Sequence, residues 1–315
     1  MRTKRKISII GAGFVGSTCA YALMNSGIAT EMCIYDINMD KALGEVMDLV
    51  HGMSFVKPIN IYAGGIEETK DSDIVVITAG APQKEGETRL DLIDKNYKIF
   101  ESFIPPIVKA SPNAILLVVS NPCDILTYIT YKISGLPKER VIGSGTVLDT
   151  SRLKYILSKY FEVDSKSIYG YIIGEHGDSS VATWNCARIG GATFDSFAER
   201  NNLDWDEDIK RVVAKDVVDA AYEIINRKKA TYYAIGLSVT RICEAILQNE
   251  SSILSISSYL EGEYGIEDLY LAVPTIVNAE GAKEIVQLEL SKEEQEKLKS
   301  SADILKKHIN ECLNK

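Results

Sequence analysis

Short apolar runs alternate with amphipathic stretches along the first half of the chain. The apolar runs are Lys6–Ile10, Glu31–Tyr35, Asp73–Thr78 and Ala114–Val119. Continuously apolar runs of this length are typical of parallel strands that helices cover on both faces. Stretches of helical periodicity lie between and after them, at Phe14–Asn25 and about residues 40–50, 90–109 and 123–134. The alternation predicts an α/β fold with a doubly wound parallel sheet of the Rossmann type.

The alternation of short apolar runs and helical stretches ends after about Gly143. Longer helical stretches follow, at about residues 149–160, 206–227 and 231–248, and two strand-like runs at about residues 252–260 and 269–277. A last helix is expected to begin at a capping box formed by Ser291 and Glu294. We therefore expect two domains, a Rossmann domain over residues 1–145 and a C-terminal α+β substrate domain over residues 146–315.

Composition narrows the class of protein. With 315 residues, 46% of them hydrophobic and 25% charged, the chain has the make-up of an ordinary soluble globular protein. Its net charge of −9 argues against a nucleic-acid partner, and no apolar run approaches the roughly 18 residues of a membrane span. The basic N-terminus is like that of a signal peptide, but glycines interrupt the apolar run behind it. Six cysteines without metal-binding spacing predict reduced thiols, a cytoplasmic location and no metal.

A glycine-rich loop follows the first strand. Gly11, Gly13 and Gly16 have the spacing with which a strand turns into a helix whose N-terminus binds a pyrophosphate. Asp36 lies 20 residues after Gly16, where a carboxylate can accept both ribose hydroxyls and would repel a 2′-phosphate. The pattern predicts NAD as the cofactor, in preference to NADP. The alternative is a glycine turn that serves packing alone.

His176 is one of only three histidines and follows an apolar strand, between Gly174 and Gly177. Histidine is the side chain whose unperturbed pKa lies nearest neutrality, which suits a general acid or base. Taken alone, a histidine beside glycines is more often a turn residue or a hydrogen-bonded structural residue than a catalytic one.

Several further motifs carry a resemblance to a known family. They are Gly80–Arg89 (GAPQKEGETR), Ser120–Pro122 (SNP), Leu148–Arg152 (LDTSR) and Gly174–Asp178 (GEHGD). In this order the sequence resembles the lactate/malate dehydrogenase family, and within it the bacterial L-lactate dehydrogenases, over nearly the whole chain. The resemblance implies an oxidoreductase that transfers a hydride between NADH and a 2-keto acid.

The same resemblance assigns catalytic roles. His176 is similar to the family's proton donor and acceptor, Asp149 to its orienting partner, and Arg152 to the bidentate clamp on the substrate carboxylate. Arg89 is similar to the loop arginine that polarises the substrate carbonyl. The plainer alternatives are a helix N-cap for Asp149, a surface ion pair for Arg152 and an ordinary loop residue for Arg89.

The remaining site residues are also carried over from the family. Asn121 is expected to contact both substrate and nicotinamide, and Thr231 to lie beside the substrate's methyl group. Expected neighbours of the cofactor, besides the glycines and Asp36, are Val15, Lys41, Gly80, Ala81, Val119 and Ser144.

Gln83 distinguishes between substrates. In this family, malate dehydrogenases have an arginine at the matching position and lactate dehydrogenases a glutamine. A second substrate carboxylate would be buried here without a cation, at a cost of several kcal/mol. Pyruvate and L-lactate are therefore the expected substrates, as in glycolytic pyruvate fermentation, with malate or another 2-hydroxy acid as the alternative.

Assembly and regulation rest on the resemblance alone. The family implies a homotetramer, which in many bacterial members binds fructose 1,6-bisphosphate through an arginine and a histidine. Lys154 and Tyr169 occupy those positions here, and neither reproduces bidentate phosphate binding, so allosteric activation is in doubt. Two other classes are alternatives: a metal-using NAD-dependent glycosidase, which would need a His/Cys metal pair, and a silent NAD-binding protein, which would lack a catalytic residue.

Overall fold

The alternating apolar runs of the N-terminal half form the parallel strands of one sheet. The computed structural model describes residues 4–81 and 89–313. Its parallel strands are β1 (Lys6–Ile10), β2 (Glu31–Tyr35), β3 (Asn60–Ala63), β4 (Ile74–Ile77), β5 (Ile115–Val118) and β6 (Val141–Gly143). Their order in the sheet is β6-β5-β4-β1-β2-β3, which confirms the predicted Rossmann fold.

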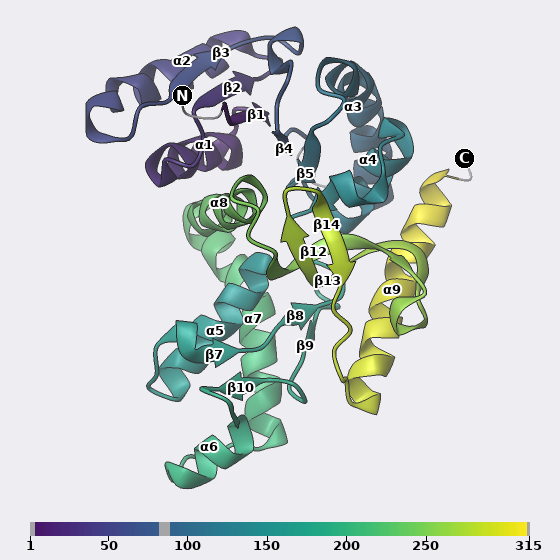
Figure 1. Cartoon of the computed structure of the whole chain (residues 1–315). Helices are drawn as coiled ribbons and strands as arrows, with labels where there is room; N and C mark the ends of the chain where they lie inside the picture. The colour runs from purple at the N-terminus through teal and green to yellow at the C-terminus, as the bar shows by residue number, and fades with distance from the viewer. Residues whose placement is uncertain (1–3, 82–88, 314–315) are drawn as a thin grey trace.

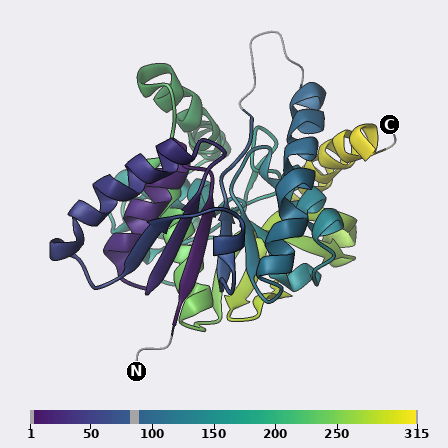
Figure 2. The ribbon, with the colours of Figure 1, turned by 90° about the horizontal axis from the view of Figure 1, so that it is seen from above.

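Helices cover both faces of this sheet (Figures 1 and 2). One face packs on α1 (Phe14–Ser26), α2 (Met39–His51) and α8 (Tyr233–Leu247); the other packs on α3 (Arg89–Ala110), α4 (Cys123–Ser134) and α9 (Lys292–Leu313). Successive strand residues point to opposite cores: Val76 packs with the first group, Val75 and Ile77 with the second. Both faces are buried, which explains why these strands are apolar throughout.

The sheet continues into the C-terminal half of the chain. Strands β12 (Ser252–Glu261), β13 (Glu267–Asn278) and β14 (Gly281–Ile285) extend it antiparallel beyond β6, giving nine strands within the described residues. Close approach at the junction depends on glycine: a Cβ on Gly143 would lie 2.7 Å from the Cβ of Ser257. The sequence predicted the strands near 252–260 and 269–277 but not that they join the first sheet.

The rest of the C-terminal half packs around a third core. It contains α5 (Val147–Tyr160), α6 (Phe194–Arg200), α7 (Glu207–Lys228) and the short strands β7 (Ile168–Tyr169), β8 (Ile172–Ile173), β9 (Val181–Ala182), β10 (Arg188–Ile189) and β11 (Ala192–Thr193). Short 3₁₀ turns lie at Met53–Phe55, Glu67–Thr69, Lys138–Arg140, Ser165–Ser167 and Glu263–Gly265.

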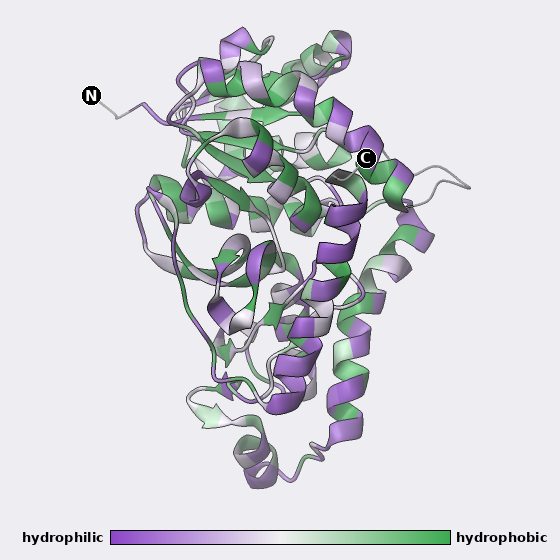
Figure 3. Ribbon diagram, turned by 90° about the vertical axis from the view of Figure 1, so that its right-hand side faces the viewer, coloured by the Kyte–Doolittle hydropathy of each residue, from purple (hydrophilic) through white to green (hydrophobic). Residues whose placement is uncertain are grey.

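Helix α9 begins at the predicted capping box. Ser291 N donates to Glu294 Oε2 (2.7 Å) and Glu294 N donates to Ser291 Oγ (3.2 Å). The outward face of this helix is hydrophilic, while its inward face joins the core (Figure 3). Within the described ranges, the helices are too short or too polar to cross a membrane.

Candidate active site

The glycine loop leaves open space at one position only. Gly11 has φ +105°, and a Cβ on Gly16 would lie 1.8 Å from the carbonyl oxygen of Gly11, so both are required by the chain's own packing. A Cβ on Gly13 would meet nothing within 4 Å. Gly13 is also the N-cap of α1 and makes no side-chain cap, so the N–H groups of the first turn remain available. The loop therefore fits a pyrophosphate, as predicted for NAD.

Asp36 lies directly after β2, beside this loop. Its Oδ2 accepts from Ala12 N (2.7 Å) and its Oδ1 accepts from Asn38 N (2.8 Å). Each carboxylate oxygen retains a lone pair, so the held carboxylate can still accept from ribose hydroxyls. Lys41 lies in the first turn of α2 with an exposed side chain, and Val15 is half-buried in the first turn of α1.

The other expected cofactor neighbours follow the carboxyl ends of β4, β5 and β6. Gly80 and Ala81 come after β4, where the buried Asn96 of α3 accepts from Ala81 N at 2.7 Å. Val119 follows β5, and Ser144 follows β6 and donates its N–H to Val118 O at 2.8 Å. Ligands of open α/β sheets bind at this edge.

A cavity of about 120 Å³ joins this edge to the C-terminal half. Six of its lining residues were expected from the sequence: Val119, Asn121, Ser144, Arg152, His176 and Thr231. Sequence reasoning missed the rest, which are Gly145, Leu148, Ala221, Ile225, Ile235 and Ser238. Most of the missed residues are apolar or small and carry no motif of their own. They give the cavity a partly apolar wall.

Asp149 links His176 to Arg152 at this cavity. Its Oδ2 lies 2.6 Å from His176 Nδ1, and its Oδ1 accepts from Arg152 Nη1 at 2.7 Å. An ionised carboxylate only accepts, so Nδ1 carries a proton and Nε2 is the ring nitrogen that can exchange one. The N-cap interpretation of Asp149 is wrong: α5 begins earlier, with Thr146 as N-cap, and Asp149 is the helix's third residue.

The pairing changes the acidity of both partners. Burial disfavours the charged form of each, but their mutual attraction and hydrogen bond outweigh burial. The pKa of His176 is consequently raised and that of Asp149 lowered, the latter with help from Arg152. The site therefore favours a protonated His176 beside an ionised Asp149. A protonated histidine can act as a general acid.

A second carboxylate holds the backbone of the histidine. Asp124 in the first turn of α4 is 2% exposed; its Oδ2 accepts from His176 N (2.8 Å) and its Oδ1 accepts from Ser257 Oγ (2.6 Å). Burial raises its pKa to about 6, although these two hydrogen bonds oppose the rise. Sequence reasoning missed Asp124; its place two residues after Asn121-Pro122 was the available signal.

Two expected substrate residues are not described in full. Gln83 lies outside the described residues. Arg89 is the first residue of α3, and its side chain is not among those that the structure describes. The expected regulatory residues lie on two neighbouring elements, α5 and β7, and have different surroundings. Lys154 lines a cavity of about 480 Å³ together with Lys166 and Arg241, whereas Tyr169 lies on β7 with its side chain exposed.

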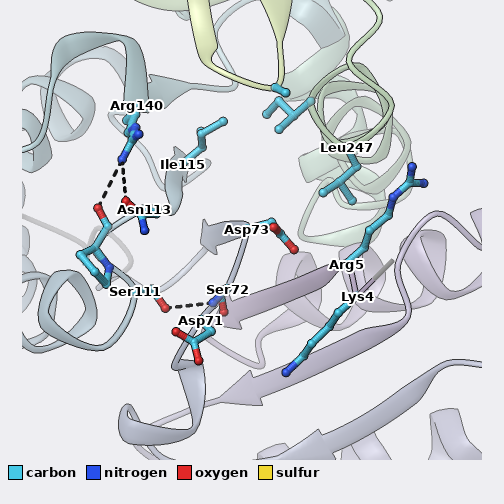
Figure 4. A pocket seen from close by; sticks show the side chains of 13 residues that line it. Lys4, Arg5, Asp71, Ser72, Asp73, Ser111, Asn113, Ile115, Arg140 and Leu247 are labelled. Carbon is cyan, nitrogen blue, oxygen red and sulfur yellow. Dashed lines mark hydrogen bonds between the residues drawn. The ribbon is translucent and has the colours of Figure 1, made fainter. Parts of the chain in front are cut away.

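Another cavity, of about 490 Å³, lies at the opposite edge of the sheet (Figure 4). Several of its residues precede the parallel strands: Arg5 lies before β1, Asp73 before β4, Asn113 before β5 and Arg140 before β6. Arg140 donates to Pro112 O and Asn113 Oδ1, both at 3.4 Å. None of the expected site residues lines this cavity, so its larger size does not make it the active site.

Comparison with known proteins agrees with this arrangement. The lactate/malate dehydrogenase NAD-binding domain matches residues 5–143, and the alpha/beta C-terminal domain of the same family matches residues 146–315. The chain belongs to the lactate/malate dehydrogenase family. The N-terminal half is thus the family's NAD-binding domain.

Several bacterial members of the family are similar to the chain. The chain is 59% identical over 304 residues to an L-lactate dehydrogenase of Clostridium perfringens, covering 96% of each chain. It is 56% identical over 310 residues to L-lactate dehydrogenase 1 of Clostridium acetobutylicum, covering 98% of this chain and 99% of that one. The crystal structure of the minor L-lactate dehydrogenase of Enterococcus mundtii in its ligands-bound form matches with a TM-score of 0.95 at 44% identity, over 98% of this chain and 99% of that one.

Proposed function

We propose that the chain catalyses the reversible reduction of pyruvate to L-lactate with NADH. The observation that carries this function is the Asp149 carboxylate, which holds His176 and Arg152 side by side at one cavity. Relatives that match nearly the full chain carry the name L-lactate dehydrogenase. When bound, NADH supplies the hydride.

The residues around the cavity bind the substrate and transfer the proton. Arg152 pairs with the substrate carboxylate through N–H groups that Asp149 does not use. His176 Nε2 gives its proton to the carbonyl oxygen, and Asp149 stabilises the imidazolium before transfer. Asn121 supplies an amide at the same wall, and Thr231 lies toward the methyl group. Arg89 and Gln83 belong to the proposal through the family resemblance.

The cavity wall also favours a monocarboxylate. Among its described lining residues, the cationic groups are Arg152 and His176, and Arg152 is committed to the first carboxylate. Oxaloacetate would bring a second charge against apolar side chains such as Leu148 and Ile235, which costs several kcal/mol. The malate reaction, the alternative that the sequence left open, is therefore the less favoured one.

NADH oxidation with pyruvate and with oxaloacetate, measured side by side, tests this function. We expect kcat/KM for pyruvate to exceed that for oxaloacetate by roughly a hundredfold or more, the factor that about 3 kcal/mol gives. Faster turnover of oxaloacetate would assign the malate reaction instead. Repeating the pyruvate assay with NADPH tests Asp36, whose carboxylate should make the phosphorylated cofactor the poorer one.

The proposal extends to location and assembly: a cytoplasmic homotetramer that ends glycolytic fermentation. Large apolar side chains exposed on and beside α1, α2 and α8 support an assembly, among them Phe14, Ile37, Leu43, Phe55 and Leu237. Light scattering of the purified protein should give the mass of four 34.8 kDa chains. A monomer would exclude this part of the proposal.

Regulation by fructose 1,6-bisphosphate is the weakest part of the resemblance. Lys154 has no acidic partner among the described residues, and burial lowers its pKa. Its amine can pair with a phosphate, but Tyr169 does not line the Lys154 cavity and brings no positive charge. We therefore expect less than a twofold change in pyruvate KM when the bisphosphate is added. A larger decrease in KM that Lys154→Ala removes would establish activation.

A further inference from the structure

The loop that carries His176 is held against the C-terminal helix. Gly174, with φ +95°, begins the loop, and a Cβ there would lie 2.9 Å from Ser301 Oγ in the middle of α9. On its other side, Gly174 exchanges backbone hydrogen bonds with Ala272 of β13, at 2.8 and 3.2 Å. Glycine therefore lets the loop approach the serine closely.

The hydrogen bonds at this contact form a closed cycle with one possible direction. Glu175 N donates to Ser301 Oγ (2.8 Å), and Ser179 Oγ donates to Glu175 Oε2 (2.5 Å). Because the Ser179 proton is used there, Ser301 must be the donor in the 2.9 Å contact between the two hydroxyls. Ser301 thus accepts from the loop backbone and donates to a loop side chain.

A hydroxyl at this position of α9 is unusual for the helix face that it occupies. Leu298, Ala302 and Leu305, each 1% exposed, surround the fully buried Ser301. Serine is a weaker helix former than alanine, and a buried hydroxyl is costly unless it is hydrogen-bonded. Here the His176 loop uses both the donor and the acceptor of the Ser301 hydroxyl, which explains why a serine is buried at this position.

Two adjacent backbone N–H groups are therefore fixed by side chains of two different helices. Asp124 of α4 accepts from His176 N, and Ser301 of α9 accepts from Glu175 N. A rotation of this peptide would move the imidazole away from Asp149 of α5, which lies 2.6 Å from its ring.

We propose that Ser301 is a positioning residue for the proton-transfer step, which it serves by fixing the Glu175–His176 backbone from the C-terminal helix. The inference rests on the proposed function, since it concerns the orientation of that reaction's proton donor. It makes α9, which reaches the C-terminal end of the described chain, part of the support of the active site.

The dependence of pyruvate reduction on pH should reveal this role. The charged groups that face His176 are Asp149 and Arg152 of α5 and Asp124 of α4, with Glu175 beside it in the loop. The carboxylates of Asp149 and Asp124 raise its pKa against burial and Arg152. A loosened loop weakens the Asp149 contact, so the pKa should fall. Pyruvate reduction needs the imidazolium, and its alkaline limb should move to lower pH.

The test compares Ser301→Ala with Ser300→Ala, a matched change at the exposed neighbouring position of the same helix. For S301A we expect kcat with pyruvate to fall roughly fivefold to tenfold, the effect of one lost buried hydrogen bond. NADH affinity should stay within about twofold, and the alkaline limb should shift by roughly half a pH unit. S300A should match the wild type in all three measurements.

Ser179→Ala and the double variant complete the experiment. Because both serines act in one cycle, the loss in S179A/S301A should be smaller than the product of the single losses. Multiplicative losses, an unshifted pH limb or S301A activity equal to that of S300A would overturn the proposal. If S301A does not fold, the alkaline limb of Ser179→Ala, a change at a half-buried position, tests the proposal instead: an unshifted limb overturns it. An inactive wild type would overturn the proposed function instead.

Discussion

The cofactor edge and the proton-transfer cluster are built in opposite ways. At the cofactor edge, backbone conformation within about 26 residues of chain brings Gly11, Gly13, Gly16 and Asp36 together. The cluster around His176 is assembled by side chains from four separate elements, α4, α5, β12 and α9. The first therefore depends on local stereochemistry, and the second on the packing of the two halves of the chain.

This difference has an energetic side. The glycine loop contributes N–H groups and space, neither of which changes with pH. The His176 cluster contains two carboxylates with opposite pKa shifts, lowered for Asp149 and raised for Asp124. Substitutions at the cofactor edge should therefore alter binding or folding, whereas those in the cluster should alter turnover and its pH dependence.

The largest expected effect is on turnover, in His176→Gln. Glutamine can keep a hydrogen bond to Asp149 but cannot supply a proton near neutral pH. We expect kcat with pyruvate to fall by roughly 10³ to 10⁴, the upper range for loss of a general acid. NADH binding, followed by its fluorescence, should change less than about threefold. Loss of NADH binding would show that His176 supports the cofactor edge and that the two regions are not separable.

The two glycine substitutions should separate folding from binding within the cofactor edge. In Gly16→Ala the new methyl overlaps the Gly11 carbonyl at 1.8 Å, so unfolding free energy should fall by roughly 3 kcal/mol or more. In Gly13→Ala the methyl enters open space, so the melting temperature should stay near that of the wild type. NADH affinity should nevertheless fall, by roughly tenfold.

Calorimetry and NADH titration of both variants provide the measurements. Wild-type affinity in G13A would mean that the pyrophosphate does not lie against this glycine. Wild-type stability in G16A would mean that the turn can relax at little cost, and that the third glycine is not required by packing.

The sequence predicted the cofactor edge better than the cluster for the same reason. The glycine spacing and Asp36 are local, and most predicted strands and helices agree with the structure to within a few residues. The pairing of His176 with Asp149, 27 residues apart, was inferred from a family resemblance rather than from periodicity. The catalytic roles remain predictions.

Contacts between distant residues were beyond the sequence pattern. Ser257 and Ser301 are 133 and 126 residues from their partners Asp124 and Glu175, and serines within a strand and a helix carry no positional signal. The antiparallel extension of the sheet by β12 was missed for a similar reason, because the pattern of a strand does not indicate which strand it pairs with. Among the short strands β7 to β11, the sequence predicted β8, which precedes His176; the others are too short for a periodic pattern to show.

The effect confined to a narrow pH range is on stability, in Asp124→Asn. The folded-state pKa of Asp124 is about 6, above its ordinary 3.8, because burial favours the neutral acid. The folded chain therefore binds this proton more tightly than the unfolded chain, and the resulting stability is present below about pH 4 and lost as pH rises through about 6. The loss is on the order of 3 kcal/mol. Asparagine can present an oxygen to His176 N and does not titrate, so D124N should lose no such stability.

Urea unfolding of both proteins between pH 4 and 7, at one protein concentration, measures the difference. The stability of D124N relative to the wild type should rise between pH 4 and 6 and then level off. His176 acts in the same direction at higher pH: its raised pKa gives stability that is present below its ordinary pKa of 6.5 and lost above it, so its contribution changes little between pH 4 and 6. Parallel curves would mean that Asp124 ionises in the folded protein as easily as in water, and that the charge beneath the His176 loop costs the fold nothing.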